Sequence, residues 1–419
     1  MIWDRVRADV VALSGAAVLL LTGVVRPIQV QSAFASPAVL ALASLFVIAY
    51  AMELSGLLDA VIGGLVAICR RIGRFGLWIV IFLAGAASAF LNNTPIVVLT
   101  APVVRDAARS LNVSPKGFLM PLSYAAVLGG SCTLIGTSTN LLVNDMAAVA
   151  GQPRFGLFEI TPVGLCIAAA GGLYLLLFSS RLARDDGQAD VDLGNSPAGS
   201  REPGLAGGQV GLARAFAPAR KFQPLKAAAS FAVFAGVITL AALNVAPIAA
   251  CALAGAVLLI LAGVITADEA YSGLRADVLM LIAGMLVIGI ALDVSGVASS
   301  ATQSFIVVME GLSPPLALVI VYGATLFATE LLSNATVAVL FTPIAVSLAE
   351  ALNVSPRPFL AAVMAAGSAA FATPFGYQTN ALVYQMGRYN YLDFVKVGLP
   401  LNLITWVVGV IAIQAYFPF

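Results

Sequence analysis

Two short polar stretches interrupt long apolar segments of this sequence, and their residue types suit ion binding. The first reads Asn-Asn-Thr-Pro at 92–95, and the second reads Ser-Asn-Ala-Thr at 333–336. A proline after polar residues can end one helix and occupy the first turn of the next. Each stretch therefore predicts the tip of a helical hairpin, where carbonyl groups of one helix end attract cations and free N–H groups of the next attract anions. Such a tip can hold a sodium ion and an anion side by side without a charged side chain.

Two further polar stretches fall inside apolar segments of membrane-spanning length. Residues 133–140 read Thr-Leu-Ile-Gly-Thr-Ser-Thr-Asn, and residues 373–380 read Thr-Pro-Phe-Gly-Tyr-Gln-Thr-Asn. Glycine, proline and clustered hydroxyls at this depth demand protein or water neighbours, so each stretch predicts a broken helix. Ser88 and Thr329 add hydroxyl oxygens one helical turn before the tips, which suits a hard monovalent cation. Two breaks at matching positions of a duplicated chain point to a binding site.

Each of these residues alone also has a simpler interpretation. Ser, Thr and Asn in membrane helices often bond to a neighbouring helix or to their own backbone, and only the four stretches together favour a site. Glu330 is an intramembrane carboxylate, a type of residue that is functional by default. It can be a coupling or gating group, proton-linked or not, or a cap for local backbone. We expect Asp145, near the outer end of its half-helix, to be solvated.

The composition is that of a membrane protein. Of 419 residues, 61% are hydrophobic and 10% are charged, whereas soluble chains carry about 25% charged residues. Apolar runs near the length of about 20 residues that crosses a bilayer recur along the chain, and lipid allows them only as helices here. The sequence has no histidine and four scattered cysteines without a CxxC pair. These facts argue against a metal centre, a cofactor and an enzyme, and a net charge of +1 gives no sign of a nucleic-acid partner.

The chain contains an internal repeat. Leu-Asn-Val-Ser-Pro occurs at 111–115 and again at 352–356. At nearly the same shift, Asn93 matches Asn334, and Thr-Asn at 139–140 matches 379–380. Such ordered self-similarity indicates a duplicated architecture.

The hydropathy pattern predicts an all-α polytopic membrane protein with two inverted repeats, re-entrant helical hairpins and broken transmembrane helices. Five spans separate the starts of the repeats, and an odd number inverts them. The predicted spans are 8–26, 37–54, 117–149 (broken), 160–180, 226–244, 248–265, 274–292, 357–386 (broken) and 396–417. The first repeat covers 1–180 with a hairpin at 75–109, and the second covers 226–419 with a hairpin at 315–350. Span 226–244 has no counterpart before residue 8.

Residues 181–225 predict a linker, because this segment is rich in Gly, Ala, Pro and charge and cannot bury enough apolar surface to fold alone. Residues 56–72 and 295–311 predict interfacial helices. This topology puts 18 of the 21 Lys and Arg residues on one side and only Arg26, Arg154 and Arg357 on the other. The positive-inside rule makes the crowded side cytoplasmic, in a bacterial inner membrane, with the carboxyl terminus in the periplasm.

The tips and breaks resemble those of the divalent anion:sodium symporter family, within the ion transporter superfamily of citrate- and arsenite-type permeases. That family has two inverted repeats, each with a hairpin ending in a Ser-Asn-Thr motif; here the tips read Asn-Asn-Thr at 92–94 and Ser-Asn-Ala at 333–335. The stretch 373–380 looks most like the bacterial branch that carries TrkA-C domains between its halves. Those domains are replaced here by the 181–225 linker. Family members usually begin with one more helix.

The resemblance implies an elevator mechanism, in which hairpins and broken helices move as one body against a dimeric scaffold. Sodium ions, the coupling ions, would bind at two sites. The first site comprises Ser88, Asn92, Asn93 and Gly136. The second comprises Thr329, Asn334 and Ala372, with Glu330 as a coupling candidate. The anion would touch Asn93, Thr94, Thr133, Asn334 and Thr373, and we add Ser333, Thr379 and Asn380 from the same tip and break.

The resulting hypothesis is sodium-coupled symport of a sulfate-like oxyanion or a di- or tricarboxylate. Its partners are the anion, the lipid bilayer and, in a homodimer, a second copy. A proton-linked or arsenite-type permease of the same superfamily is the alternative that Glu330 supports. A non-transporting membrane scaffold explains neither the paired breaks nor the inversion.

The charge distribution makes the topology testable. A cysteine reporter at Ser196 should resist a membrane-impermeant thiol reagent in intact cells, whereas a reporter at Phe419 should react. Strong labelling at Ser196 from outside would overturn the orientation.

Overall fold

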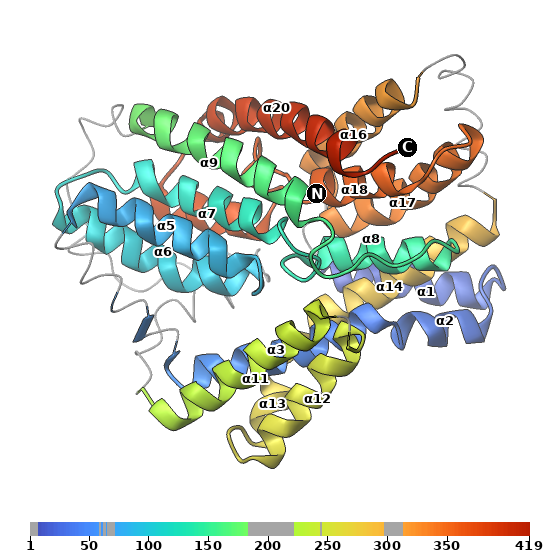
Figure 1. The fold of residues 1–419 in the computed structure, drawn as a ribbon, viewed down its shortest axis with the longest axis horizontal. Coiled ribbons are helices and arrows are strands. Elements are labelled where there is room, and N and C mark those ends of the chain that lie inside the picture. The colour runs from blue at the N-terminus through green and yellow to red at the C-terminus, as the bar shows by residue number, and fades with distance from the viewer. Residues whose placement is uncertain are drawn as a thin grey trace.

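In the computed structural model, helices are the regular secondary structure of the described residues, which are 7–57, 60–61, 64, 72–182, 222–243, 245–296 and 313–419 (Figure 1). Most of the predicted linker and of the predicted interfacial helices at 56–72 and 295–311 lies outside these residues. The helices of the first half are α1 (Ala8–Leu21), α2 (Pro27–Phe34), α3 (Pro37–Leu54), α5 (Arg74–Ser88), α6 (Asn93–Ser110), α7 (Lys116–Gly130), α8 (Ser138–Val149) and α9 (Thr161–Leu182). Those of the second half are α11 (Pro224–Ala242), α12 (Ile248–Leu261), α13 (Ala267–Gly273), α14 (Ala276–Val294), α16 (Pro314–Leu331), α17 (Asn334–Ala351), α18 (Arg357–Gly367), α19 (Gln378–Gly387) and α20 (Tyr391–Tyr416).

The helices have the lengths and hydropathy of a multi-span membrane protein. Within the described residues, six helices are long and apolar enough to cross a bilayer, or seven if the bent pair α13–α14 counts as one span. Three predicted span boundaries are wrong. α20 begins at Tyr391 rather than 396, and two spans end early: α1 stops at Leu21 rather than 26, and α12 stops at Leu261 rather than 265. Gly23 and Gly263 follow these ends with φ values of 75° and 68°, a left-handed conformation that terminates a helix. The short helices α2 and α13, which the sequence analysis did not predict, come next.

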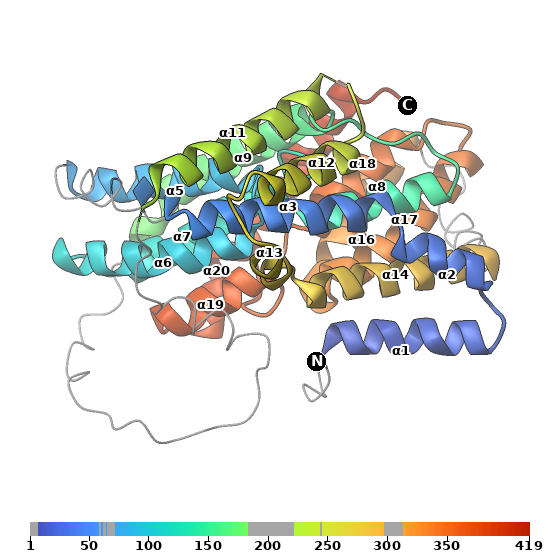
Figure 2. The same ribbon diagram turned by 90° about the horizontal axis from the view of Figure 1, so that it is seen from below.

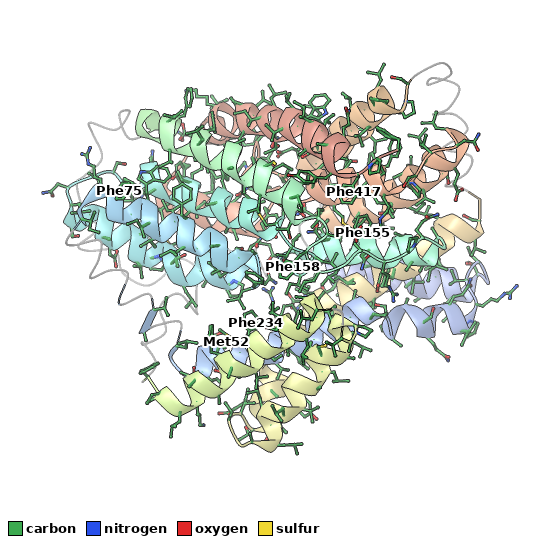
Figure 3. All side chains as sticks on the ribbon, in the orientation of Figure 1. Met52, Phe75, Phe155, Phe158, Phe234 and Phe417 are labelled. Carbon is green, nitrogen blue, oxygen red and sulfur yellow. The ribbon has the colours of Figure 1, made fainter. Side chains whose placement is uncertain are left out.

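The predicted hairpins and broken helices are confirmed. α5 and α6 meet at residues 89–92, and α16 and α17 meet at residues 332–333. Irregular backbone at 131–137 divides α7 from α8, and at 368–377 it divides α18 from α19. The two hairpins approach each other from opposite ends of the molecule (Figure 1), and Phe75 marks the far end of the first (Figure 3). This arrangement brings both tips toward the middle of the molecule (Figure 1).

The helix contacts follow the repeat. α5 packs on α7 as α16 packs on α18, and α7 packs on α9 as α18 packs on α20. Other contacts cross between the halves: α1 packs on α14 as α12 packs on α3, and α8 packs on α17 as α19 packs on α6. Asn112 and Asn353 both have φ 52°, and Gly56 and Gly296 have φ 72° and 73°. The two halves therefore share one backbone plan and pack against each other.

The helices form two groups. The first group comprises α1, α2, α3, α11, α12, α13 and α14, and the second comprises the hairpins, the broken helices, α9 and α20 (Figures 1 and 2). In the first group α11 packs on α12 and α3 and has no described counterpart on α1, as the sequence pattern predicts. The division of the chain at 180 and 226 stays a prediction.

A glycine brings a long helix against each break. A Cβ atom on Gly398 of α20 would collide with the carbonyl group of Phe371, and a Cβ atom on Gly164 of α9 would lie 2.6 Å from the Cα atom of Cys132. Both obstacles are backbone, which cannot move aside as a flexible side chain can. These two contacts fix the depth at which the broken backbone lies.

Replacement of Gly398 by alanine should destabilise the folded protein by about 1–3 kcal/mol, because overpacking against backbone forces the break to shift. Thermal unfolding of purified protein in detergent measures this effect. Gly236→Ala in α11 is the control, since nothing lies within 4 Å of its added Cβ atom and alanine gains up to about 1 kcal/mol in a helix. Equal unfolding temperatures for the two variants would contradict the packing argument.

Candidate functional site

The tip of the first hairpin is a buried cluster of polar atoms. The Ser88 hydroxyl donates to Asn93 Oδ1, and Asn93 Nδ2 donates to the Tyr377 hydroxyl at 2.8 Å. Both Ser88 and Asn93 are fully buried. Asn92 caps α6 by accepting the Thr94 N–H, so the first turn of α6 begins at this point. The tip thus presents side-chain oxygens beside a helix N-terminus.

The tip of the second hairpin repeats this geometry. The Thr329 hydroxyl lies 2.8 Å from Asn334 Oδ1, the amide oxygen five residues later, as Ser88 lies beside Asn93. It also lies 2.8 Å from the carbonyl oxygen of Gly367 at the end of α18. Ser333 caps α17 by accepting the Thr336 N–H at 3.2 Å. Equivalent hydroxyl–amide pairs therefore mark both tips.

The two breaks also share a hydrogen-bond pattern. The hydroxyls of Thr133 and Thr373 accept the N–H groups of Gly136 and Gly376, both at 3.1 Å. The side-chain amides of Asn140 and Asn380 donate to the carbonyls of Thr133 and Thr373, at 2.9 and 3.2 Å. These contacts satisfy backbone groups that the broken helices leave open.

Oxygen atoms converge at Gly136, one of the predicted sodium ligands. A Cβ atom on Gly136 would be 2.9 Å from the carbonyl oxygen of Ala89 and closer still to that of Gly130. These carbonyls end α7 and the first arm of the hairpin, where the helix dipole is negative. The Asn93 amide also packs against Gly130. Carbonyl, amide and hydroxyl oxygens in this arrangement are suitable ligands for a monovalent cation.

Several predicted anion ligands are engaged within the protein. The Thr133 hydroxyl donates to the Ala89 carbonyl, so it ties the first break to the first hairpin. The Thr379 hydroxyl lies 2.8 Å from that of Ser123. The Asn380 amide donates to the Ala370 and Thr373 carbonyls of the second break and accepts from Ser123. Direct contact of these groups with an anion stays a prediction. Thr94 bonds Gln378 Oε1 at 3.2 Å, which links the first tip to the second broken helix.

Glu330 is held by three donors at the second break. Its Oε1 atom accepts the Ala372 N–H and the Asn402 side-chain N–H, both at 2.7 Å, and its Oε2 atom accepts the Thr373 hydroxyl at 2.9 Å. Ala372, assigned above to the second sodium site, therefore meets Glu330 through its N–H group.

Sequence reasoning missed three residues of the site. Tyr377 of the second break accepts a hydrogen bond from Asn93 of the first tip. Ser123 of α7 bonds Asn380 of α19, and Asn402 of α20 bonds Glu330. Tyr377 stands inside a stretch already singled out. Ser123 and Asn402 are isolated polar residues in apolar runs. Sequence alone does not show whether such a residue belongs to a site or only makes a structural hydrogen bond.

A cavity of about 70 Å³ lies between the two helix groups, beneath the first tip. Figure 3 shows Met52 and Phe234 of the first group, which line it. The tip contributes Asn92, and the first break contributes Gly136 and Ser138. The cavity therefore reaches the candidate cation ligands from the side of the molecule where α3 ends.

Toward the other end of α3, the two groups are in polar contact. Asp145 of α8 accepts the N–H of Ala38 at 3.0 Å, in the first turn of α3, and pairs with Arg154 at 3.3 Å. Asp145 is 4% exposed, so the expectation of a solvated side chain is wrong. The positive end of the α3 dipole and the arginine explain why the carboxylate is buried.

A second cavity, about 320 Å³, is apolar and lies between α5, α7 and α9. Ala168 and Gly172 of α9 line it, where the repeat counterparts in α20 are Asn402 and Trp406. Ala89 also lines it, at the position that Glu330 holds in the second repeat. Smaller side chains in the first repeat thus leave a cavity where larger side chains fill the space in the second repeat.

Re-entrant hairpins, broken helices and oxygen-lined tips in the middle of the molecule define a multi-span membrane transporter. The chain belongs to the citrate transporter family, whose model matches residues 1–349 and, overlapping them, 313–419. This match confirms the resemblance to the ion transporter superfamily.

Relatives and solved structures agree with this placement. An uncharacterized transporter of Synechocystis sp. is 25% identical over 94% of this chain and 91% of its own length. Sodium/sulfate cotransporter 1 of Chlamydomonas reinhardtii is 34% identical over 38% of this chain and 18% of its own length. The Alcanivorax borkumensis YdaH transporter has the same fold, with a TM-score of 0.65, 14% identity and 98% of each chain covered. Neisseria gonorrhoeae MtrF follows with a TM-score of 0.60 and 14% identity over 97% of this chain and 94% of its own.

The paired hydroxyls at the tips generate a test. Ser88→Ala and Thr329→Ala should each raise the sodium concentration for half-maximal transport roughly several-fold, because loss of one oxygen ligand costs about 1 kcal/mol. Thr342→Ala is the matched control: Thr342 is also fully buried, but its hydroxyl bonds the Ala338 carbonyl of its own helix. Uptake at varied sodium and saturating substrate measures the effect. A shift in one tip variant alone would mean that a single repeat binds sodium.

Proposed function

We propose that this chain is a secondary active transporter that carries a small divalent anion together with sodium. The substrate class is a sulfate-like oxyanion or a di- or tricarboxylate. The observation that carries the proposal is the repeated hydroxyl–amide pair, Ser88 with Asn93 and Thr329 with Asn334, each next to the N-terminus of a hairpin helix. Oxygens for a cation and the positive end of a helix dipole for an anion lie side by side at both tips.

Two sets of relatives support the substrate class. The family model is described as a citrate transporter, and partial relatives in Chlamydomonas reinhardtii are named sodium/sulfate cotransporters. Both descriptions concern small anions of high charge. Sodium coupling rests on the named cotransporters and on the oxygen-rich tips.

We further propose an elevator motion of the second helix group against the first. In the described state, α8 contacts α3 through Asp145 and Ala38, while the cavity beneath the first tip reaches toward the other end of α3. With the positive-inside orientation, this state is closed to the periplasm and faces the cytoplasm. The proposed setting is the bacterial inner membrane, with the scaffold group forming a homodimer.

A proton-linked or arsenite-type permease is the second candidate, and the buried Glu330 carboxylate favours it. Uptake that is independent of a sodium gradient and driven by a proton gradient would support this candidate.

Uptake into proteoliposomes tests the main proposal. A sodium gradient should drive accumulation of sulfate, thiosulfate, succinate or citrate, and potassium in place of sodium should abolish it. Asn93→Ala and Asn334→Ala should each lose transport while remaining folded, because each removes an amide shared by the ion and the anion. Gln31→Ala, an exposed residue of α2, is the control. Normal rate and sodium dependence in both tip variants would show that the site assignment is wrong.

A further inference from the structure

The hairpin arm and the long helix beside it pack together in one repeat but not in the other. In the second repeat α16 packs on α20. The centroid of the Trp406 ring lies 5.8 Å from that of Phe327, and Trp406 Nε1 donates to the Val319 carbonyl at 2.9 Å. In the first repeat, α5 and α9 both lie along α7, but in the part of the chain that the structure describes they do not pack closely on each other. The apolar cavity of about 320 Å³ lies in this gap.

The residues that line the gap explain why it stays open. Small residues stand at five positions where the second repeat has larger ones: Gly85, Ala86, Ala89, Ala168 and Gly172 match Leu326, Phe327, Glu330, Asn402 and Trp406. One exchange runs the other way, because Phe82 matches Gly323. Phe82 is 42% exposed, so it lies at the mouth of the cavity rather than inside it.

The mouth of the cavity lies on an apolar outer surface. Two further residues at the mouth, Phe158 and Leu165, are also exposed. Leu173 and Leu177 continue the exposed surface along the same face of α9, at multiples of four residues from Leu165. Large exposed apolar patches of this kind mark contact with a membrane or a partner. In a multi-span membrane protein, this surface and the cavity behind it face lipid tails.

The polar side chains that line the cavity are already engaged within the protein. The Thr133 hydroxyl donates to the Ala89 carbonyl, and the Thr161 hydroxyl donates to the Cys132 carbonyl at 2.7 Å. The Cys132 thiol lies 3.4 Å from the Leu128 carbonyl. A buried water needs about two to four polar partners. The lining therefore suits a hydrocarbon rather than water or a polar solute.

The depth of the cavity matches the reach of a lipid tail. α5 begins at Arg74, and both Arg74 and Phe75 are exposed, as charged and aromatic residues are at the level of lipid headgroups. Figure 3 shows Phe75 at the outer end of the hairpin and Phe158, at the cavity, near the middle of the molecule. From Arg74 to Phe82, where the cavity begins, the helix rises about 12 Å at ~1.5 Å per residue. One leaflet of a hydrocarbon core of about 30 Å is about 15 Å deep, so a chain whose headgroup lies beside Arg74 ends within the cavity.

We propose that this cavity binds one acyl chain of a membrane phospholipid, from the leaflet in which α5 begins. The chain takes the place that the Trp406 and Phe327 side chains fill in the second repeat. At its inner end it lies against Ala89 and Thr133, whose hydrogen bond ties the first hairpin to the first break. The lipid is therefore part of the packing that holds the first hairpin arm, whereas the second arm is held by the protein's own aromatic rings.

Photo-crosslinking of the whole chain in a bilayer tests the site. We would reconstitute the protein into vesicles of phosphatidylethanolamine and phosphatidylglycerol that contain a small share of phosphatidylcholine with a diazirine near the end of one acyl chain. Mass spectrometry then maps the adducts. They should form on Ala125 and Leu128 of α7, which line the cavity but are only 7% and 3% exposed. Adducts on the exposed Leu173 and Leu177 are the internal reference, because lipid outside the cavity reaches them.

Two substitutions fill the cavity from different helices. Ala168→Leu acts from α9, and Ala86→Phe acts from α5 and copies Phe327 of the second repeat. Each should abolish the adducts on α7 and leave the reference adducts unchanged. Ala169→Leu is the matched control, because Ala169 is exposed and adjacent on α9 but does not line the cavity. It should keep both sets of adducts.

Reference adducts without adducts on α7 in the parent protein would overturn the proposal. Adducts on α7 that persist in both filled variants would overturn it as well, because lipid would then reach α7 by another route. Neither measurement involves uptake of an anion. The lipid site therefore stands or falls separately from the proposed transport function.

Discussion

The structure depends on one constraint, which is that a helix broken inside a bilayer exposes backbone groups that lipid cannot satisfy. Each break is closed by the repeat's own threonine and asparagine: Thr133 and Asn140 in one half, Thr373 and Asn380 in the other. Long helices approach these breaks through Gly164 and Gly398, at which a side chain would collide with backbone. These contacts hold the open carbonyl groups at fixed positions. The hydrogen bonds and close packing that stabilise the broken helices therefore also form oxygen-lined sites.

The duplicated chain has two copies of this broken-helix arrangement, and their side chains differ. Ser123 donates to the Asn380 amide oxygen, whereas the repeat counterpart of Ser123 is Met364, and Asn140 Oδ1 is buried without a partner among the described residues. Glycine at 172 faces Phe82 on α5, while at the matching place Trp406 covers Gly323 of α16. One half thereby contains an apolar cavity and the other a charged, filled seam. The backbone is symmetric, but the chemistry of the two halves is not.

The contacts between the two helix groups differ along their length. At one end a buried carboxylate, Asp145, lies on the N-terminus of α3, and toward the other end the groups separate enough to leave a cavity under the first tip. Among the described residues, α14 also packs on α17 and α8 across this boundary. In the proposed motion, the polar contact at one end and the cavity at the other would exchange places as one group slides along the other. The geometry is compatible with a rigid motion of packed groups, which is the usual way that interfaces switch between states.

Sequence alone determined much of this protein: its helical membrane class, the repeat, the hairpin tips near residues 92 and 333, and the helix breaks. Polar and proline-rich stretches inside apolar runs carry that information, because few backbones other than broken helices accept them in lipid. The pairing of Ser88 with Asn93 and of Thr329 with Asn334 was also within reach, since residues five apart at a helix end lie close together. Tertiary structure decided what the local pattern could not encode. Asn402 meets Glu330 across 72 residues, Tyr377 meets Asn93 across 284, and Asp145 is buried on α3 rather than solvated. Such contacts depend on how helices from both repeats interlock, and a polar residue in an apolar run does not reveal which distant partner it will meet.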